Sequence, residues 1–134
     1  MVDSLVEQVW RRAGSFCEYC RFFQDDYPIP FVIDHVIARQ HGGQHVLTNL
    51  ALSCLHCNAH KGPNIAGLDP RSGKLTRLFN PRRQRWNHHF RWCGQLVVGI
   101  TPVGRTTVAV LAMNDPEPVR LRQALIEEGV FPTR

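Results

Sequence analysis

Apolar side chains lie at helical spacing near the start of the chain. Between residues 3 and 13 they recur every three or four positions, with Asp3 suited to cap the helix and Gly14 to end it. Near the other end, Asp115-Pro116 predicts the start of a helix that runs to about residue 128, with Gly129 as the stop. We therefore expect one helix close to each end of the chain.

The region between residues 31 and 63 alternates short apolar runs with polar segments. Phe31–Ile33 is mostly β-branched, which favours a strand that delivers Asp34 and His35 at its end. After a loop over 38–48, residues 50–53 predict a second short strand. Residues 55–61 then predict a short helix, broken by a Gly-Pro pair. The expected order is strand, loop, strand, helix.

Farther on, the pattern is mixed. The turn sequence at 69–73 lies between two apolar segments, 65–68 and 75–79, and so predicts a hairpin. Residues 96–100 are a strand candidate. Residues 101–113 alternate like a strand, yet begin with Thr-Pro, which is typical of a helix start, and we favour a helix. The fold class expected is therefore α+β.

The cysteines fall into a pattern typical of a zinc site. Two C-x-x-C pairs, Cys17/Cys20 and Cys54/Cys57, supply the four thiolates that a closed structural site needs. Buried thiols or a redox pair are the alternatives, but they rarely repeat the same short spacing. The fifth, Cys93, is expected to be a buried core thiol.

Four residues between the two cysteine pairs or directly after the second pair have side chains suited to phosphodiester hydrolysis. His35 has a reference pKa near neutrality and suits a general base, and Asp34 suits a metal ligand. Asn49 could orient the region of the histidine. Asn58, directly after the last cysteine, could add an amide oxygen. Such oxygen ligands favour Mg²⁺ or a similar hard ion, with Mn²⁺ as an alternative.

The order of these residues resembles the HNH endonuclease family. The matching motifs are the two cysteine pairs, Asp34–Ile37, Gly42-Gly43, Asn49-Leu50 and the Asn58–Gly62 segment. The resemblance implies a ββα-metal (His-Me finger) core around one divalent ion, with structural zinc. It also implies His35 as general base, Asp34 and Asn58 as metal ligands, and Asn49 as the residue that orients the loop of the base.

Several nearby residues leave alternatives open. His60 is a rival of Asn58 as ligand, although side chains two apart on a helix do not share a face. Lys61 matches the closing lysine of the family, and either contacts phosphate or is an ordinary surface lysine. His41 and His45 could touch substrate, but solvent-facing loop histidines are the simpler interpretation.

The formal charge of +5 is concentrated in residues 71–91, which contain seven basic residues and no acid. Such a stretch favours a nucleic-acid partner, with Arg82, Arg83 and Arg85 as candidate contacts. These arginines alternate with aromatics over a segment with some helical spacing. The aromatics either stack on bases or pack into the core with the arginines outside, and both can hold at once. His88-His89 is treated as structural.

Together these features predict a metal-dependent nuclease that acts on DNA, with RNA as the alternative substrate. Residues 1–63 would form the HNH core with its N-terminal helix, and residues 64–134 a small, basic α/β extension packed on it. The competing hypotheses are a non-cleaving, zinc-stabilised nucleic-acid-binding module and a hydrolase of another phosphodiester. We expect a cytoplasmic monomer or homodimer without a membrane segment.

Overall fold

The computed structural model describes residues 4–132 and begins with helix α1, Leu5–Ala13. Ser4 caps this helix, because its hydroxyl accepts a hydrogen bond from the Glu7 amide at 3.1 Å. Gly14 ends it in the left-handed conformation, as expected. The expected cap Asp3 lies outside the described residues.

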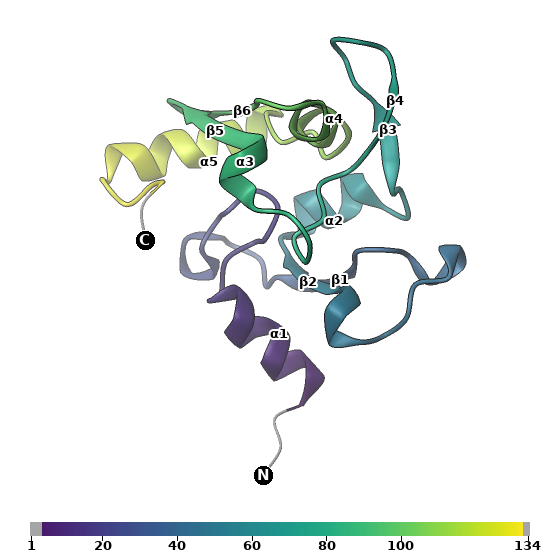
Figure 1. Cartoon of the computed structure of the whole chain (residues 1–134). Coiled ribbons are helices and arrows are strands. Elements are labelled where there is room, and N and C mark those ends of the chain that lie inside the picture. Colours follow the sequence, from purple (N-terminus) through teal and green to yellow (C-terminus); the bar gives the residue numbers. More distant parts are fainter. Residues whose placement is uncertain (1–3, 133–134) are drawn as a thin grey trace.

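The central unit has the predicted order of strand, loop, strand and helix. Strand β1 (Val32–His35) pairs antiparallel with β2 (Leu50–Ser53), and helix α2 (Leu55–Lys61) follows directly (Figure 1). Asp34 and His35 are the last two residues of β1, as expected, and they pair with Ala51 and Leu50 of β2. The ladder thus fixes the backbone of both residues.

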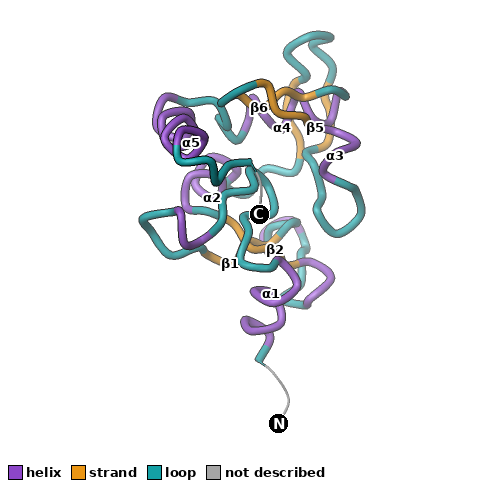
Figure 2. Tube along the Cα trace, turned by 90° about the vertical axis from the view of Figure 1, so that its left-hand side faces the viewer, coloured by secondary structure: helices purple, strands orange, loops and turns teal. Residues whose placement is uncertain are grey.

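The rest of the chain adds two hairpins and three helices. Their bounds are β3 Ala66–Leu68, β4 Leu75–Arg77, α3 Trp86–His89, β5 Phe90–Cys93, β6 Leu96–Gly99, α4 Pro102–Val110 and α5 Pro116–Glu127. Each pair β3–β4 and β5–β6 is antiparallel, so the described residues contain three separate two-stranded sheets (Figure 2). Short 3₁₀ turns occupy Gln24–Asp26, Arg39–His41 and Leu47–Asn49.

Two helices expected in this region are present. The helix over 101–113 is confirmed: Thr101 accepts a hydrogen bond from the Gly104 amide, and Pro102 occupies the first turn of α4. The helical segment within 81–92 is α3. It ends at His89, and the chain then enters β5 because Phe90 pairs with Gly99.

Cys93 is exposed, so its prediction as a buried core thiol is wrong. It pairs with Leu96 at the end of the β5–β6 hairpin, where the strands turn and little chain remains to cover it. Free cysteines are usually buried, but a position at a hairpin turn overrides that tendency.

An aromatic cluster joins the extension to the central unit. The Trp86 ring centroid lies 5.0 Å from those of Phe90 and Trp92, and Trp92 contacts Phe131 edge to face at 4.8 Å. The Trp86 indole N–H donates to the Tyr19 carbonyl at 2.8 Å. The aromatics thus pack inward, as one of the two interpretations of the arginine-rich segment expected.

A second tie fastens the β3–β4 hairpin to α4. The buried carboxylate of Asp69 accepts from Arg105 Nε at 3.0 Å and from Nη2 at 2.9 Å, a bidentate pair. These bonds hold the pKa of Asp69 well below its ordinary value. Gly67 allows the close approach, since a Cβ there would come within 2.5 Å of Val110 Cγ2. Within residues 4–132, no helix is long and apolar enough to cross a membrane.

Candidate active site

The four paired cysteines form one buried cluster beside the central unit. Their ligand atoms all lie within 4.8 Å of one another, and Cys20 Sγ is 3.6 Å from Cys54 Sγ. Backbone amides support the sulfurs: the Cys20 amide points to Cys17 Sγ at 3.5 Å and the Cys57 amide to Cys54 Sγ at 3.3 Å. Four thiolates at this spacing fit a tetrahedral zinc ion.

The electrostatics of the cluster also favour a cation. Burial and the neighbouring thiols raise the pKa of Cys20 well above its ordinary value, so the four sulfurs cannot all ionise without a compensating charge. Arg122 of α5 supplies part of it. Its guanidinium is fully buried over the rings of Phe22 and Trp92, and burial lowers its pKa while the nearby thiolates oppose that change.

The first cysteine pair connects directly to Asp34. The Tyr19 hydroxyl, between the two cysteines, donates to Asp34 Oδ2 at 2.7 Å. Lys61 Nζ lies 3.3 Å from Oδ1 and 3.2 Å from Oδ2, and it also donates to the His35 carbonyl at 3.0 Å. The zinc frame and the end of α2 therefore hold the Asp34 carboxylate from two sides.

The Lys61 side chain is only 1% exposed, so the interpretation as a surface lysine is wrong. The alternative interpretation, a contact with phosphate, would need an exposed ammonium group. The Lys61 ammonium is buried and bound to Asp34 and the His35 carbonyl. Burial raises the pKa of Asp34, and the charge of Lys61 opposes this. Such a pair is stable only while both partners are present.

The His35 imidazole is half-buried on the other face of β1. Its Nε2 lies 3.0 Å from His45 Nδ1, and the Arg39 Nε–H points to the same nitrogen at 3.5 Å. Burial lowers the pKa of His35, with further contributions from Arg39 and His45. His35 thus stays neutral to lower pH than an ordinary histidine. The loop supplies both partners, and neither contact was predicted from the sequence.

Asn49 closes the loop that separates β1 from β2. Its side chain accepts from the Ile37 amide at 2.9 Å and donates to the carbonyls of Ile37 at 3.0 Å and Gln44 at 2.9 Å. Gly43 lies under this side chain: a Cβ there would come within 1.7 Å of the Ile37 carbonyl oxygen. A residue with a side chain at position 43 would thus displace the loop.

Asp34, His35 and Asn58 line one open pocket of about 310 Å³. The other lining residues are Ile33, Ala38, Arg39, Gln40, Gly62 and Pro63. The rival ligand His60 does not line it, because its ring is bound to the His56 carbonyl and faces Asp115. A carboxylate and an amide oxygen facing an open pocket suit a hard divalent ion completed by water and phosphate.

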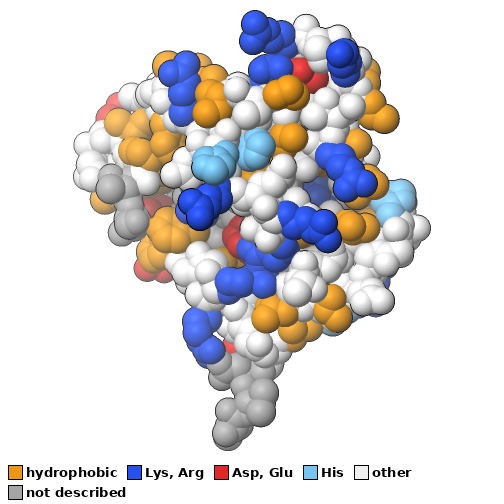
Figure 3. Space-filling model, in the orientation of Figure 1, with side chains coloured by type: hydrophobic (Ala, Val, Ile, Leu, Met, Phe, Trp, Pro, Cys, Tyr) orange, Lys and Arg blue, Asp and Glu red, His pale blue; other side chains and the backbone are white. Residues whose placement is uncertain are grey.

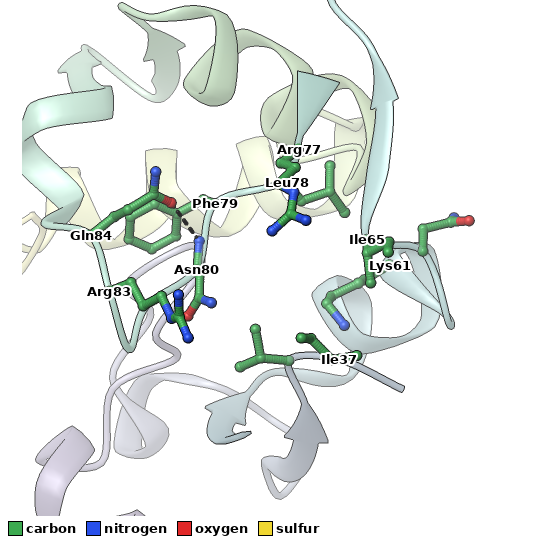
Figure 4. Close-up of a pocket in the computed structure, with 11 residues that line it drawn as sticks. Ile37, Lys61, Ile65, Arg77, Leu78, Phe79, Asn80, Arg83 and Gln84 are labelled. Atoms are coloured by element: carbon green, nitrogen blue, oxygen red, sulfur yellow. Dashed lines mark hydrogen bonds between the residues drawn. The ribbon is translucent and has the colours of Figure 1, made fainter. Parts of the chain in front are cut away.

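A second, smaller cavity of about 190 Å³ is bordered by Lys61, the partner of Asp34. Figure 4 shows it between Ile37 and Lys61 on one side and the segment from Leu78 to Asn80 on the other. The side chains of Arg77 and Arg83 border it, so an apolar space beside the candidate site has cationic edges.

The three arginines expected to contact nucleic acid are not equivalent. Arg83 and Arg85 are exposed, and Lys and Arg side chains are spread over the face in Figure 3 with few acidic ones between them. Arg82 instead pairs with Glu18 and donates to the Leu50 carbonyl at 3.2 Å, with its side chain 12% exposed. The Arg82 guanidinium is thus engaged within the protein, unlike those of Arg83 and Arg85.

Comparison with known proteins adds one match. Residues 17–64 match the family model described as HNH endonuclease. The matched range begins at the first cysteine of the zinc cluster and extends just past α2. It contains every residue that lines the pocket of Asp34, His35 and Asn58. No curated protein and no solved structure matches the chain.

Proposed function

We propose that the protein is a metal-dependent endonuclease that hydrolyses DNA phosphodiester bonds, a proposal supported by the match of residues 17–64 to the HNH endonuclease model. The observation that carries the proposal is the single pocket lined by Asp34, His35 and Asn58. A base, a carboxylate and an amide oxygen meet there beside an arginine, which is the set of groups that phosphodiester hydrolysis requires.

His35 is the proposed general base. When the proton of the neutral ring is on Nε2, it donates to His45 Nδ1 at 3.0 Å and Nε2 accepts no hydrogen bond from Arg39. This tautomer leaves the lone pair on Nδ1 to accept a proton from water. The lowered pKa keeps this ring neutral at the start of the reaction. Asn49 holds the loop that carries His45 and Arg39, so it acts by positioning.

Asp34 and Asn58 would hold the divalent ion, Mg²⁺ or Mn²⁺. Its chemistry would be to stabilise the charge that develops on the phosphate and on the leaving oxygen. Tyr19 and Lys61 fix the carboxylate in place before the ion arrives. Both Asp34 and Lys61 are buried, so solvent reaches the carboxylate little.

The exposed arginines on the extension are proposed to bind the DNA backbone. Arg83 and Arg85 carry charges that no acid in residues 71–91 offsets, and Arg39 adds one at the pocket itself. RNA remains the alternative substrate. A cytoplasmic location is proposed because zinc-binding thiols persist in a reducing compartment. One active site would cut one DNA strand per encounter, whether the protein is a monomer or a homodimer.

A plasmid-nicking assay in EDTA, Mg²⁺ and Mn²⁺ tests the proposal. We expect nicking with Mg²⁺ or Mn²⁺ and none in EDTA, while the tightly held zinc stays bound. If the protein shifts DNA in a gel but does not cleave it with either metal, the competing hypothesis of a non-cleaving binding module is correct instead.

A further inference from the structure

A second group of metal-ligating side chains lies outside the pocket, where α2 meets the start of α5. His56 and His60 are four residues apart on α2, and their ring centroids are 4.1 Å apart. Asp115 precedes the first residue of α5, and its Oδ2 is 3.8 Å from His60 Nε2. One potential ligand atom from each of the three lies within 4.8 Å of the others.

Backbone carbonyls orient both imidazoles. His56 Nε2 lies 2.8 Å from the Ala112 carbonyl oxygen, and His60 Nδ1 lies 2.8 Å from the His56 carbonyl oxygen. A carbonyl only accepts, so each of these nitrogens carries a proton. The lone pairs are then on His56 Nδ1 and His60 Nε2. Metal-ligating histidines have this arrangement, in which the other ring N–H is bound to an acceptor.

Asp115 is also placed unusually for its position. Aspartate before the first turn of a helix ordinarily caps it by accepting from a backbone amide, but Asp115 makes no such bond. Its carboxylate is directed to His60 instead. The positive end of the α5 dipole disfavours a cation here, whereas the carboxylate and the C-terminal turn of α2, which carries His60, favour one.

We propose that His56, His60 and Asp115 form a second metal site, for a divalent transition ion such as Ni²⁺, Co²⁺ or Zn²⁺. Two imidazoles and one carboxylate suit these ions rather than Mg²⁺, which prefers oxygen ligands. The ligands are partly exposed, so water completes the shell. The site joins α2 of the HNH domain to α5 of the extension, which lie next to each other in Figure 2. A bound ion would fasten the two together.

The test is a metal count on the zinc-loaded, full-length protein titrated with Ni²⁺. Nickel and zinc are measured together by mass spectrometry after equilibrium dialysis. We expect one equivalent of zinc to stay in the cysteine cluster and one equivalent of nickel to bind at His56, His60 and Asp115, besides any nickel at the ion position of Asp34 and Asn58. His60→Ala should weaken nickel binding by at least about tenfold, as loss of one of three ligands predicts, with zinc content unchanged.

Three comparisons make the result decisive. His88→Ala removes an exposed histidine on α3 and should leave nickel binding as in the wild type. Asn58→Ala removes a proposed ligand of the active-site ion, so this variant loses nickel bound there and should keep the nickel held by His56, His60 and Asp115. Thermal unfolding should shift upward with nickel in Asn58→Ala and not in the double variant Asn58→Ala/His60→Ala. Nickel binding to Asn58→Ala that survives the addition of His60→Ala, or no nickel binding to Asn58→Ala, would overturn the proposal.

Discussion

Replacing Lys61 by methionine leaves the buried Asp34 carboxylate without its cation. The two side chains are 1% and 5% exposed and their charged atoms lie 3.2 Å apart, so solvent screens them little. Removing one partner of a buried ion pair typically costs about 3–5 kcal/mol of stability, because the remaining charge stays desolvated. We expect a loss of that size, which lowers the urea midpoint by about 1 M or more.

The loss should depend on pH. Burial already raises the pKa of Asp34 above 3.8, and without Lys61 it rises further. Between the unfolded and the native pKa of Asp34, the native variant keeps a proton that the unfolded chain releases. The stability of the variant therefore falls as pH rises through this range. The destabilisation relative to wild type should therefore be smaller near about pH 5 than near about pH 8.

Urea unfolding of the zinc-loaded protein at both pH values measures this effect. Lys74→Met, at an exposed lysine, is the matched control and should change stability by less than about 0.5 kcal/mol. Adding Asp34→Asn to Lys61→Met should recover part of the loss, because the carboxylate is then gone. A Lys61→Met variant within about 1 kcal/mol of wild type, or a loss that ignores pH, would refute the reasoning.

Five further substitutions have distinct expected outcomes. Cys20→Ser should lower zinc content and abolish cooperative unfolding in circular dichroism, whereas intact zinc content would exclude that residue as a ligand. Arg82→Ala should lower thermal stability, because it leaves Glu18 unpaired. Arg85→Ala should weaken DNA binding in salt-titrated anisotropy with unchanged stability. Reversed effects would contradict a structural role for Arg82 and a DNA-binding role for Arg85. Asn49→Ala should lower the nicking rate with metal binding retained, and an unchanged rate would remove its positioning role. Arg39→Ala removes one cause of the lowered His35 pKa, so the acid limb of the pH–rate profile should move to higher pH rather than stay in place.

Much of the central unit could be predicted from the sequence because local signals there agree with the tertiary fold. The two C-x-x-C pairs, the β-branched strand before Asp34 and the Gly-Pro break after α2 each specify their own element. Thr101-Pro102 likewise marked α4 despite the strand-like alternation that follows it. Such agreement makes the choice of Asn58 over His60 possible from spacing, and the structure places Asn58 in the pocket.

Long-range pairing could not be predicted in the same way. Lys61 and Arg82 look like ordinary cations in the sequence, and only the fold brings them to Asp34 and Glu18, 27 and 64 residues away. His45 contacts His35 because Asn49 folds the loop back. A single sequence shows charge and spacing, but it does not show which buried carboxylate each lysine or arginine will pair with.

The central proposal is that His35 activates water for DNA cleavage, and single-turnover nicking by His35→Ala tests it most directly. His41→Ala, at an exposed histidine of the same loop, is the matched control. General-base catalysis contributes about 10²–10⁴-fold, so His35→Ala should nick at least about 100-fold more slowly than wild type in Mg²⁺ or Mn²⁺. Zinc content should be unchanged and His41→Ala should remain active, whereas nicking by His35→Ala at the wild-type rate would contradict the account.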